Sequence, residues 1–384
     1  MIEFRSVTKR FPDGTVAVDE LDLVAEDGRI TVFVGPSGCG KTTSLRMVNR
    51  MIDPTSGTVS IDGADVTSRQ PAELRRGIGY VIQQAGLFPH RTVLDNVATV
   101  PRLTGATRRA ARSRAAELLD LVGLSAEAGR RYPAQLSGGQ QQRVGVARAL
   151  AADPPVLLMD EPFSAVDPVV RDGLQEELLR LQGELGKTIL FVTHDIDEAI
   201  KVGDVVAVLR EGGRLAQYAP PAELLARPAD DFVAGFVGRD RGYRGLGFLA
   251  AEGVPVRELA RVEAGTQAGT AKEQLDGGWA IVVDTAGRPV GWIDADTLGR
   301  TPASTPVEGD LLAAGGSIYD VNSDGRAVAG GAAGSLRSAL DAALSSPSGL
   351  GVAVDRTGTV VGAVVAEDVL AALAAARRAG EVPS

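Results

Sequence analysis

The sequence has a single cysteine, no long apolar stretch and no excess of positive charge, and each shortage excludes a class of function. Cys39 is alone among 384 residues, which excludes an intrachain disulfide. No window approaches about 18 uninterrupted apolar residues, so we expect no membrane span, and residues 1–5 lack the apolar stretch of a secretion signal. The net charge of −9 argues against nucleic acid as the main partner. We expect a cytoplasmic protein, and any membrane role would belong to another polypeptide.

A chain of this length is expected to form two or three domains. Residues 1–30 show short β segments. Apolar runs of buried-strand length occur at residues 30–34, 156–159 and 188–192. The last two runs are separated by a helical stretch at residues 169–185. Alternating strands and helices predict an α/β fold with a mostly parallel sheet covered on both faces.

The character of the sequence changes after residue 238. Residues 239–245 are charged and glycine-rich, which is typical of a linker. Beyond them, the pattern of residues 281–293 returns at residues 352–364. Each copy predicts a strand, an Asp-x-x-Gly turn, a second strand and the start of a helix. A repeated β-β-α unit indicates two stacked half-modules that form a second, smaller domain.

A glycine-rich loop at residues 35–42 connects an apolar strand to a predicted helix and matches the pattern of a phosphate-binding loop. Gly35 and Gly40 allow backbone conformations in which successive N–H groups face the phosphates. Lys41 would reach the β- and γ-phosphates, and the Thr42 hydroxyl would ligate Mg²⁺. A glycine turn before an unrelated helix is the alternative, but the strand–loop–helix context favours phosphate binding.

Two adjacent acids follow the apolar run at residues 156–159, at the strand end where ligands of α/β sheets collect. Asp160 is placed to hold Mg²⁺ through water. Glu161 is placed to polarise the attacking water, because phosphoryl transfer depends on positioning and charge stabilisation. A pair of helix-capping acids is the alternative. Beside a phosphate loop, we interpret the pair as part of a site that hydrolyses MgATP.

A second anion site is predicted at the start of another helix. Ser137 is a good N-cap, and the glycine amides that follow it can bind an anion. A capped helix with a flexible entry is the alternative. One chain has little use for two anion sites separated by a helical segment, unless they meet across a dimer. The residues of this motif are Leu136, Ser137, Gly138, Gly139 and Gln140.

Together with Gln83, residues 164–167 and His194, these motifs closely resemble the nucleotide-binding subunit of ATP-binding cassette (ABC) transporters, over about residues 1–238. The resemblance implies a P-loop NTPase cassette with an N-terminal antiparallel β part and a helical subdomain at about residues 84–148. It also implies a head-to-tail homodimer. Each ATP would lie between the phosphate loop of one subunit and Ser137, Gly138, Gly139 and Gln140 of the other.

The resemblance assigns roles to further residues. Phe11 would stack on adenine, with an ordinary core aromatic as the alternative. Gln83 would contact Mg²⁺ and the attacking water, and His194 would sense the γ-phosphate. Ser164 and Asp167 would link the two active sites. The predicted catalytic residues are Glu161, His194, Gln83 and Lys41; the predicted Mg²⁺ ligands are Thr42, Gln83 and Asp160; the predicted ATP contacts are Phe11, Gly35, Pro36, Ser37, Gly38, Cys39, Gly40, Lys41, Thr42 and Thr43.

Several segments resemble one importer subgroup, the ATPases of bacterial uptake systems for glycine betaine, carnitine, choline or proline. They are residues 79–84, 86–93, 136–148, 193–199 and 228–233. The resemblance implies an ATPase that powers osmoprotectant import at the cytoplasmic face of the inner membrane. Its partners would be a membrane permease, onto which residues 84–131 dock, and indirectly an external solute-binding protein. The alternatives are an importer ATPase for another solute, such as an amino acid or polyamine, and a soluble cassette protein outside transport.

The C-terminal repeat resembles a pair of cystathionine-β-synthase (CBS) motifs, which osmoprotectant importers use for regulation. In that family a Thr and an Asp hold a ligand's ribose. The first copy here has Asp294 and Thr297 at those positions, and the second has Val365 and Asp368, so only Asp368 keeps the expected type. Nucleotide binding, ionic-strength sensing and a structural dimer contact remain alternatives. The predicted divisions are an ATP-binding domain at 1–238, a linker at 239–245, a CBS-like domain at 246–376 and a tail at 377–384.

Overall fold

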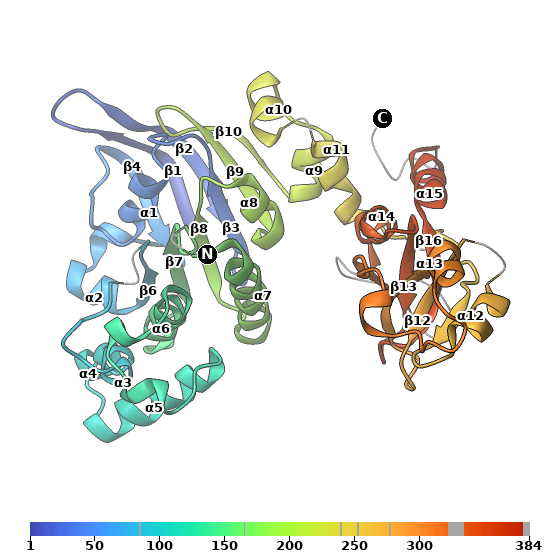
Figure 1. The fold of residues 1–384 in the computed structure, drawn as a ribbon. Helices are drawn as coiled ribbons and strands as arrows, with labels where there is room; N and C mark the ends of the chain where they lie inside the picture. The colour runs from blue at the N-terminus through green and yellow to red at the C-terminus, as the bar shows by residue number, and fades with distance from the viewer. Residues whose placement is uncertain are drawn as a thin grey trace. The chain divides into compact units, whose positions relative to one another are not determined.

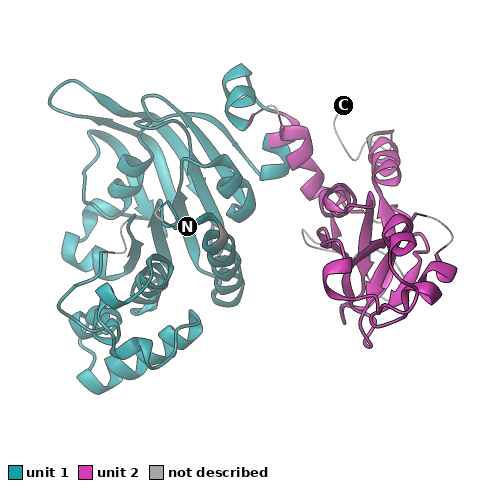
Figure 2. Cartoon of the chain, viewed as in Figure 1, with its two compact units in different colours: residues 1–224, 228–237 teal, residues 225–227, 238–384 magenta. Residues whose placement is uncertain are grey.

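The chain folds into two compact units in the computed structural model (Figure 2). The structure describes residues 1–83, 86–164, 166–238, 240–251, 253–275, 278–321 and 334–378. The first unit consists of residues 1–224 and 228–237, and the second of residues 225–227 and 238–384. Each unit has hydrophobic core clusters of its own.

A six-stranded sheet forms the centre of the first unit (Figure 1). Its strands are β3 (Ile30–Val34), β6 (Ile78–Val81), β7 (Val156–Asp160), β8 (Thr188–Val192), β9 (Val205–Arg210) and β10 (Arg214–Ala219). They lie in the order β10-β9-β3-β8-β7-β6, and every pair except β10 with β9 runs parallel. Because other elements cover both faces, β3, β7 and β8 are buried along their whole length. The predicted mostly parallel sheet is confirmed.

A second, four-stranded antiparallel sheet belongs to the same unit. Its strands are β1 (Ile2–Arg10), β2 (Val16–Ala25), β4 (Ser56–Ile61) and β5 (Ala64–Asp65), in the order β2-β1-β4-β5. Helix α1 (Lys41–Val48) contributes Leu45, Met47 and Val48 to one core cluster with Phe4 of β1 and Phe33 of β3. The helix therefore packs between the two sheets, and this packing fixes the loop that precedes it.

Further helices surround the parallel sheet. They are α2 (Pro71–Arg76), α7 (Pro168–Leu185), α8 (Ile196–Val202), α9 (Pro221–Ala226) and α10 (Asp231–Val237), with the 3-10 turn η1 (Val66–Ser68). Helix α8 contacts β3, and α7 contacts α8. The predicted helix at residues 169–185 is confirmed, with its start one residue earlier.

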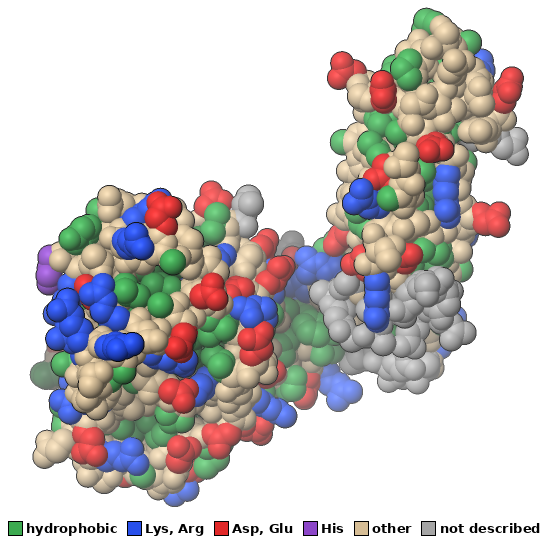
Figure 3. All heavy atoms as spheres, turned by 90° about the horizontal axis from the view of Figure 1, so that it is seen from below, with side chains coloured by type: hydrophobic (Ala, Val, Ile, Leu, Met, Phe, Trp, Pro, Cys, Tyr) green, Lys and Arg blue, Asp and Glu red, His purple; other side chains and the backbone are tan. Residues whose placement is uncertain are grey.

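A helical part is inserted between β6 and β7. It consists of α3 (Val93–Val97), α4 (Thr99–Leu103), α5 (Arg108–Leu121) and α6 (Gly138–Leu150), with the turns η2 (Ala128–Arg130) and η3 (Pro133–Gln135). Gly105, with φ of 101°, separates α4 from α5, whose N-cap is Thr107. Side chains of Lys and Arg gather on the face that carries α4 and α5, where Arg102, Arg108 and Arg109 are exposed (Figure 3). Residues 84 and 85, at the predicted start of this part, lie outside the described residues.

The second unit is built from two copies of one motif, as the sequence repeat predicts. Sheets β11-β12-β13 and β14-β15-β16 have the same arrangement, with a parallel first pair and an antiparallel second pair. Ile281 and Trp292 of one sheet share a core cluster with Val352, Val354 and Val360 of the other. The elements are β11 (Arg261–Glu263), α12 (Ala268–Gln274), β12 (Trp279–Val283), β13 (Pro289–Asp294), α13 (Ala295–Arg300), η5 (Gly309–Leu311), β14 (Ile318–Asp320), α14 (Leu336–Ser345), β15 (Leu350–Val354), β16 (Val360–Val365) and α15 (Ala366–Arg378).

The segment predicted as a linker is largely helical instead. Residues 241–245 form α11 (Arg241–Gly245), followed by η4 (Leu246–Phe248), and both belong to the second unit. Asp240 pairs with Arg244 at 3.2 Å, four positions later. Tyr243 donates a hydrogen bond to Asp341, which raises the pKa of the tyrosine. The charged side chains of this segment therefore form an ion pair within α11, and Tyr243 binds a side chain of α14. Arg239 and residues 379–384 of the predicted tail lie outside the described part of the chain.

None of the described helices has both the length and the apolar character that a membrane span requires.

Candidate functional site

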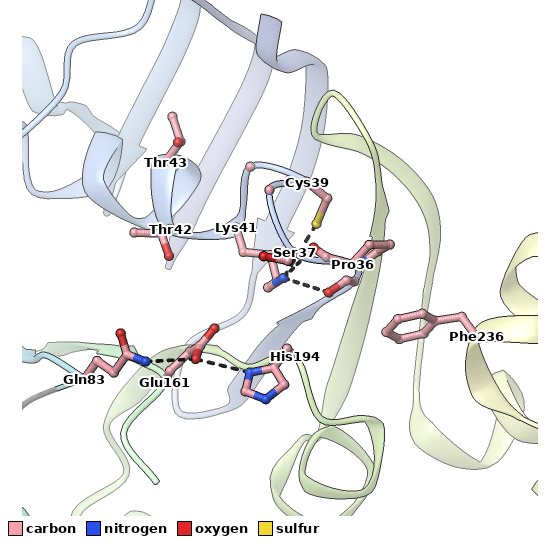
Figure 4. A pocket seen from close by; sticks show the side chains of 13 residues that line it. Pro36, Ser37, Cys39, Lys41, Thr42, Thr43, Gln83, Glu161, His194 and Phe236 are labelled. Atoms are coloured by element: carbon pink, nitrogen blue, oxygen red, sulfur yellow. Dashed lines mark hydrogen bonds and ion pairs between the residues drawn. The ribbon is translucent and has the colours of Figure 1, made fainter. Parts of the chain in front are cut away.

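A cavity of about 650 Å³ opens at the carboxyl ends of the parallel strands, where α/β sheets bind their ligands (Figure 4). The loop after β3 forms one wall, and residues that follow β6, β7 and β8, together with one residue of α10, form the rest. The lining residues are Gly35, Pro36, Ser37, Gly38, Cys39, Gly40, Lys41, Thr42, Thr43, Gln83, Glu161, His194 and Phe236. All predicted loop residues and all four predicted catalytic residues, Glu161, His194, Gln83 and Lys41, thus line one cavity.

The path of the phosphate loop depends on two of its glycines. Gly35 has φ of 155°, and a Cβ there would lie 2.2 Å from the Leu209 carbonyl oxygen. Gly40 has φ of 96°, and a Cβ there would lie 2.0 Å from the Ala17 carbonyl oxygen. Both contacts are with backbone, which cannot give way. Any side chain at either position would therefore displace the loop from β9 or β2.

The charge of Lys41 is fixed inside the loop. Its buried Nζ donates hydrogen bonds to the carbonyl oxygens of Gly35 at 2.7 Å and Pro36 at 2.9 Å. The Cys39 sulfur lies 3.8 Å from the same nitrogen, and burial raises the pKa of this thiol. The ammonium group can therefore bind an anion that enters the loop without a large movement of the backbone.

A hydroxyl and a carboxylate meet at the floor of the site. The Thr42 hydroxyl, at the start of α1, donates a hydrogen bond of 2.8 Å to Oδ1 of Asp160, at the end of β7. Arg46 is 4.0 Å from Oδ2 of the same carboxylate. Burial raises the pKa of Asp160, although the Thr42 hydrogen bond opposes this. A partly desolvated carboxylate beside a hydroxyl is a hard-oxygen donor pair of the kind that Mg²⁺ prefers, so these residues fit the ion.

The described residues contain no group of three or more His, Cys, Asp or Glu side chains that could hold a metal alone. This agrees with the way Mg²⁺ binds in nucleotide sites, through one or two protein oxygens plus phosphates and water.

Three polar side chains converge on the side of the cavity opposite the phosphate loop, each from the end of a different strand (Figure 4). Oε2 of Glu161 is 3.1 Å from Nδ1 of His194 and accepts a hydrogen bond of 3.4 Å from Nε2 of Gln83. Glu161 has φ of 47°, a left-handed conformation that non-glycine residues adopt rarely, and its N–H donates to the Val192 carbonyl. Strain of this kind is concentrated at functional sites, where the surrounding structure holds it. The carboxylate is thus held between an imidazole and an amide.

Ser137 and its neighbours do not line this cavity. Ser137 is the N-cap of α6: its hydroxyl accepts from the Gln140 N–H at 3.3 Å, and the Gln140 side chain accepts from the Ser137 N–H. Ser137 and Gly138 are exposed. The predicted N-cap role of Ser137 is confirmed, and the N-terminus of α6 is exposed to solvent.

Of the two residues predicted to link two active sites, Ser164 contacts Glu161 and Asp167 lies three positions further along the chain. The Ser164 hydroxyl donates a hydrogen bond of 3.0 Å to the Glu161 carbonyl oxygen. Asp167 is exposed directly before α7, and its carbonyl accepts from the Arg171 N–H. A contact on this short segment would therefore be transmitted to the backbone of Glu161.

The aromatic residue that lines the cavity is not the one selected from the sequence. Phe11 does not line the cavity; it follows β1, and the Lys9 ammonium lies 5.4 Å from its ring centroid. Phe236 of α10 lines the cavity instead, although sequence reasoning did not select it. No local pattern marks Phe236, because only the tertiary fold brings α10 to the phosphate loop.

The chain is similar in sequence to known transport ATPases. The profile of a family described as ABC transporter matches residues 18–164. The osmoprotectant import ATP-binding protein OsmV of Salmonella typhimurium is 46% identical over 302 residues, which are 76% of this chain and 79% of that protein. The glycine betaine/carnitine/choline transport ATP-binding protein OpuCA of Bacillus subtilis is 52% identical over 241 residues, 63% of each chain. The match thus spans less than two thirds of OpuCA.

The first unit is also similar to solved cassettes. A dimeric structure of an ATP-binding cassette in a post-hydrolysis state, bound to ADP and Pi, aligns with a TM-score of 0.53 and 34% identity. The alignment covers 58% of this chain and 99% of the cassette.

Proposed function

The chain belongs to the ABC transporter family, and from that premise we propose that it is the ATP-hydrolysing subunit that powers import of osmoprotectants through a separate membrane permease. The observation that carries the proposal is the cavity lined by Lys41, Thr42 and the Glu161 cluster, with Asp160 hydrogen-bonded to Thr42 at its edge. A cation, a hard-oxygen pair and a held carboxylate are the groups that MgATP hydrolysis requires.

Each group has a role that follows from its place. The loop amides and Lys41 bind the phosphates. Thr42 and Asp160, with Gln83, would hold Mg²⁺, which supplies positive charge to the phosphates when bound. Glu161 orients and polarises the attacking water, because its carboxylate is fixed by His194 and Gln83 at the mouth of the cavity. His194 is placed to hydrogen-bond the terminal phosphate.

Two copies of the chain complete the site in this proposal. Ser137 and Gly138 present the exposed N-terminus of α6, a helix of 13 residues whose dipole favours an anion. Since this terminus does not reach the cavity of its own chain, its phosphate partner is the ATP held by a second copy. Ser164 and Asp167 would lie between the two sites, next to Glu161. The dimeric state of the similar cassette supports this arrangement.

A groove of about 600 Å³ beside the catalytic cavity is suited to a helix of the permease. Met51, which is 54% exposed, Ile52 and Ile82 supply apolar surface there, and the groove extends to Gln83 and Asp160. The exposed arginines of α4 and α5 would flank the docked partner on the helical part. A partner seated in this groove would contact the same Gln83 that reaches Glu161, which would couple docking to hydrolysis. The chain would then lie peripherally at the cytoplasmic face of the membrane.

The solute class rests on the relatives. OsmV is named for osmoprotectant import, and OpuCA for glycine betaine, carnitine and choline transport. The cavity described here is lined by the residues of a nucleotide site, so specificity for the solute would belong to the permease and to an external binding protein.

We propose that the second unit is a tandem CBS-like regulatory domain. Its repeated β-β-α motif and shared core support this assignment. The acids at the ligand positions already have partners: Asp368 accepts two hydrogen bonds of 2.7 Å from Arg257, and Asp294 accepts from the Thr297 N–H and hydroxyl. Because these carboxylates are engaged within the chain, we expect the unit to regulate without holding a nucleotide.

The test is deletion in the source cell followed by growth at high salt. Added glycine betaine should restore growth of the wild type but not of the deletion strain, and purification of the chain should recover a membrane permease. Unimpaired betaine rescue without the gene would contradict the solute assignment. If betaine still restores growth of the deletion strain but an added amino acid or polyamine no longer does, the imported solute would be that amino acid or polyamine.

A further inference from the structure

Phe236 is the one lining residue of the catalytic cavity, among the described residues, that has no role in the account so far. It lies on α10, close to Pro36 and on the His194 side of the cavity, while Thr42 and Gln83 lie on the other side (Figure 4). Its ring is half-buried. An aromatic side chain therefore borders the end of the cavity at which His194 is placed to meet the terminal phosphate.

The helix that carries Phe236 is held in a defined position. Asp230 caps α10 by accepting from the Val233 N–H at 3.0 Å, and it forms an ion pair of 2.5 Å with Arg210 at the end of β9. The Arg210 guanidinium also lies 4.9 Å from the ring centroid of Phe232. Phe232 in turn stacks on Phe236, with ring centroids 6.3 Å apart and planes at 20°. A continuous stack thus runs from β9 to the cavity and fixes the ring of Phe236.

Helix α10 also lies directly before the second unit in the sequence. Helix α10 ends at Val237, and residue 238 begins the main segment of the second unit. Val233 and Val237 are buried, so α10 is anchored in the first unit by one face while Phe236 points to the cavity. The last helix before the second unit therefore contains a residue of the nucleotide cavity.

We propose that Phe236 is a nucleotide-contacting residue, which forms an apolar wall beside the terminal phosphoryl group and makes α10 respond to ATP rather than to ADP. The inference rests on the proposed function, since it requires that the cavity binds ATP. An apolar ring at that place excludes water, and the attraction between Lys41 and the terminal phosphate is stronger when water is excluded. ADP lacks the phosphoryl group that would meet the ring, so its binding gains little from Phe236.

The test compares the affinities of the full-length Phe236→Ala variant and the wild type for the non-hydrolysable ATP analogue adenylyl imidodiphosphate and for ADP, both with Mg²⁺, by titration calorimetry. Loss of the ring should weaken binding of the analogue by about 3- to 10-fold. Binding of ADP should change by less than about twofold. Phe236→Leu, which keeps apolar volume, should recover most of the loss. The control is Phe248→Ala, the same substitution at an exposed position outside the cavity, which should leave both affinities unchanged.

A second measurement does not depend on the stability of the alanine variant. The two native tryptophans, Trp279 and Trp292, lie in the second unit, so they give a common background for Phe236→Trp and Phe248→Trp. The ATP analogue should change the emission of the tryptophan at position 236 more than ADP does, and neither should change that at position 248.

The outcomes separate the inference from the function on which it rests. If the wild type binds the analogue but Phe236→Ala binds it equally well, or if both nucleotides lose affinity to the same extent, Phe236 does not contact the terminal phosphate and the inference is overturned. If the wild type binds neither nucleotide, the proposed function itself fails.

Discussion

Replacement of Glu161 by glutamine tests the chemistry of the site most sharply, because it removes a charge and almost nothing else. Glutamine has the same length and keeps one oxygen, which can still accept the hydrogen bond from Gln83 Nε2 at 3.4 Å and remain beside His194. Thr42 and Asp160 are hydrogen-bonded to each other, and Lys41 is held by the Gly35 and Pro36 carbonyls, so the groups that bind phosphate and Mg²⁺ are retained. The change is therefore confined to polarisation of the attacking water.

The expected loss of rate follows from that role. A positioned general base contributes about 10²- to 10⁴-fold to rate, or roughly 3–5 kcal/mol of barrier. We expect the Glu161→Gln variant to hydrolyse ATP at a rate lower by that factor, while its affinity for MgATP stays within about twofold of the wild type. Because bound ATP then persists, the variant should accumulate as a dimer when MgATP is added.

Single-turnover phosphate release measures the rate, and light scattering measures the dimer. Glu184→Gln is a matched control, since Glu184 is a half-exposed acid that pairs with Arg180 on α7 at 2.7 Å and has no part in the cavity. It should hydrolyse ATP at the wild-type rate. Turnover of the Glu161→Gln variant within threefold of the wild type would refute the assignment of the water-polarising group.

Three further predictions concern the phosphate loop, the Mg²⁺ pair and the second unit. Lys41→Ala should weaken MgATP binding by about 100-fold, since it removes the charge fixed inside the loop; unchanged affinity in calorimetry would contradict the loop assignment. Burial raises the pKa of Asp160, so its carboxyl takes up a proton at a higher pH than an exposed aspartate, and this proton competes with Mg²⁺. Below that pKa, Mg²⁺ affinity in the presence of ATP should fall by up to about tenfold per pH unit, and Asp160→Asn should remove this dependence. Asp368→Ala should leave the stoichiometry at one adenine nucleotide per chain, because Arg257 already holds this carboxylate; a stoichiometry of two in the wild type would show that the second unit binds one.

The elements that position the site could be predicted because their signals are local. The buried strands β3, β7 and β8 are nearly continuous apolar runs, and a glycine-rich loop directly after such a strand needs no long-range information. The capping box of α6 is likewise specified by four consecutive residues, 137–140. For the same reason, the repeat in the second unit was visible as a returning pattern of strand, turn and strand.

What sequence reasoning missed depends on contacts between distant segments. Phe236 enters the cavity because Arg210, Phe232 and Asp230 fix α10 against β9, and no spacing in the sequence reports that. The helix α11 was not predicted within residues 239–245, because charge and glycine content cannot distinguish a solvated segment from one whose Tyr243 contacts α14. Stacking of Phe11 on adenine stays a prediction, since its ring lies outside the lining of the cavity.

The central claim is that each ATP lies between two copies of the chain, and mixing two inactive variants tests it most directly. Lys41→Ala disables the phosphate loop, and Ser137→Ala disables the exposed helix terminus, so each homodimer should be inactive. In a 1:1 mixture, half of the dimers contain both variants and each has one intact site, so ATPase activity should return to about a quarter of the wild-type value. Activity that does not recover on mixing, together with full hydrolysis by a monomeric wild-type chain, would contradict the account.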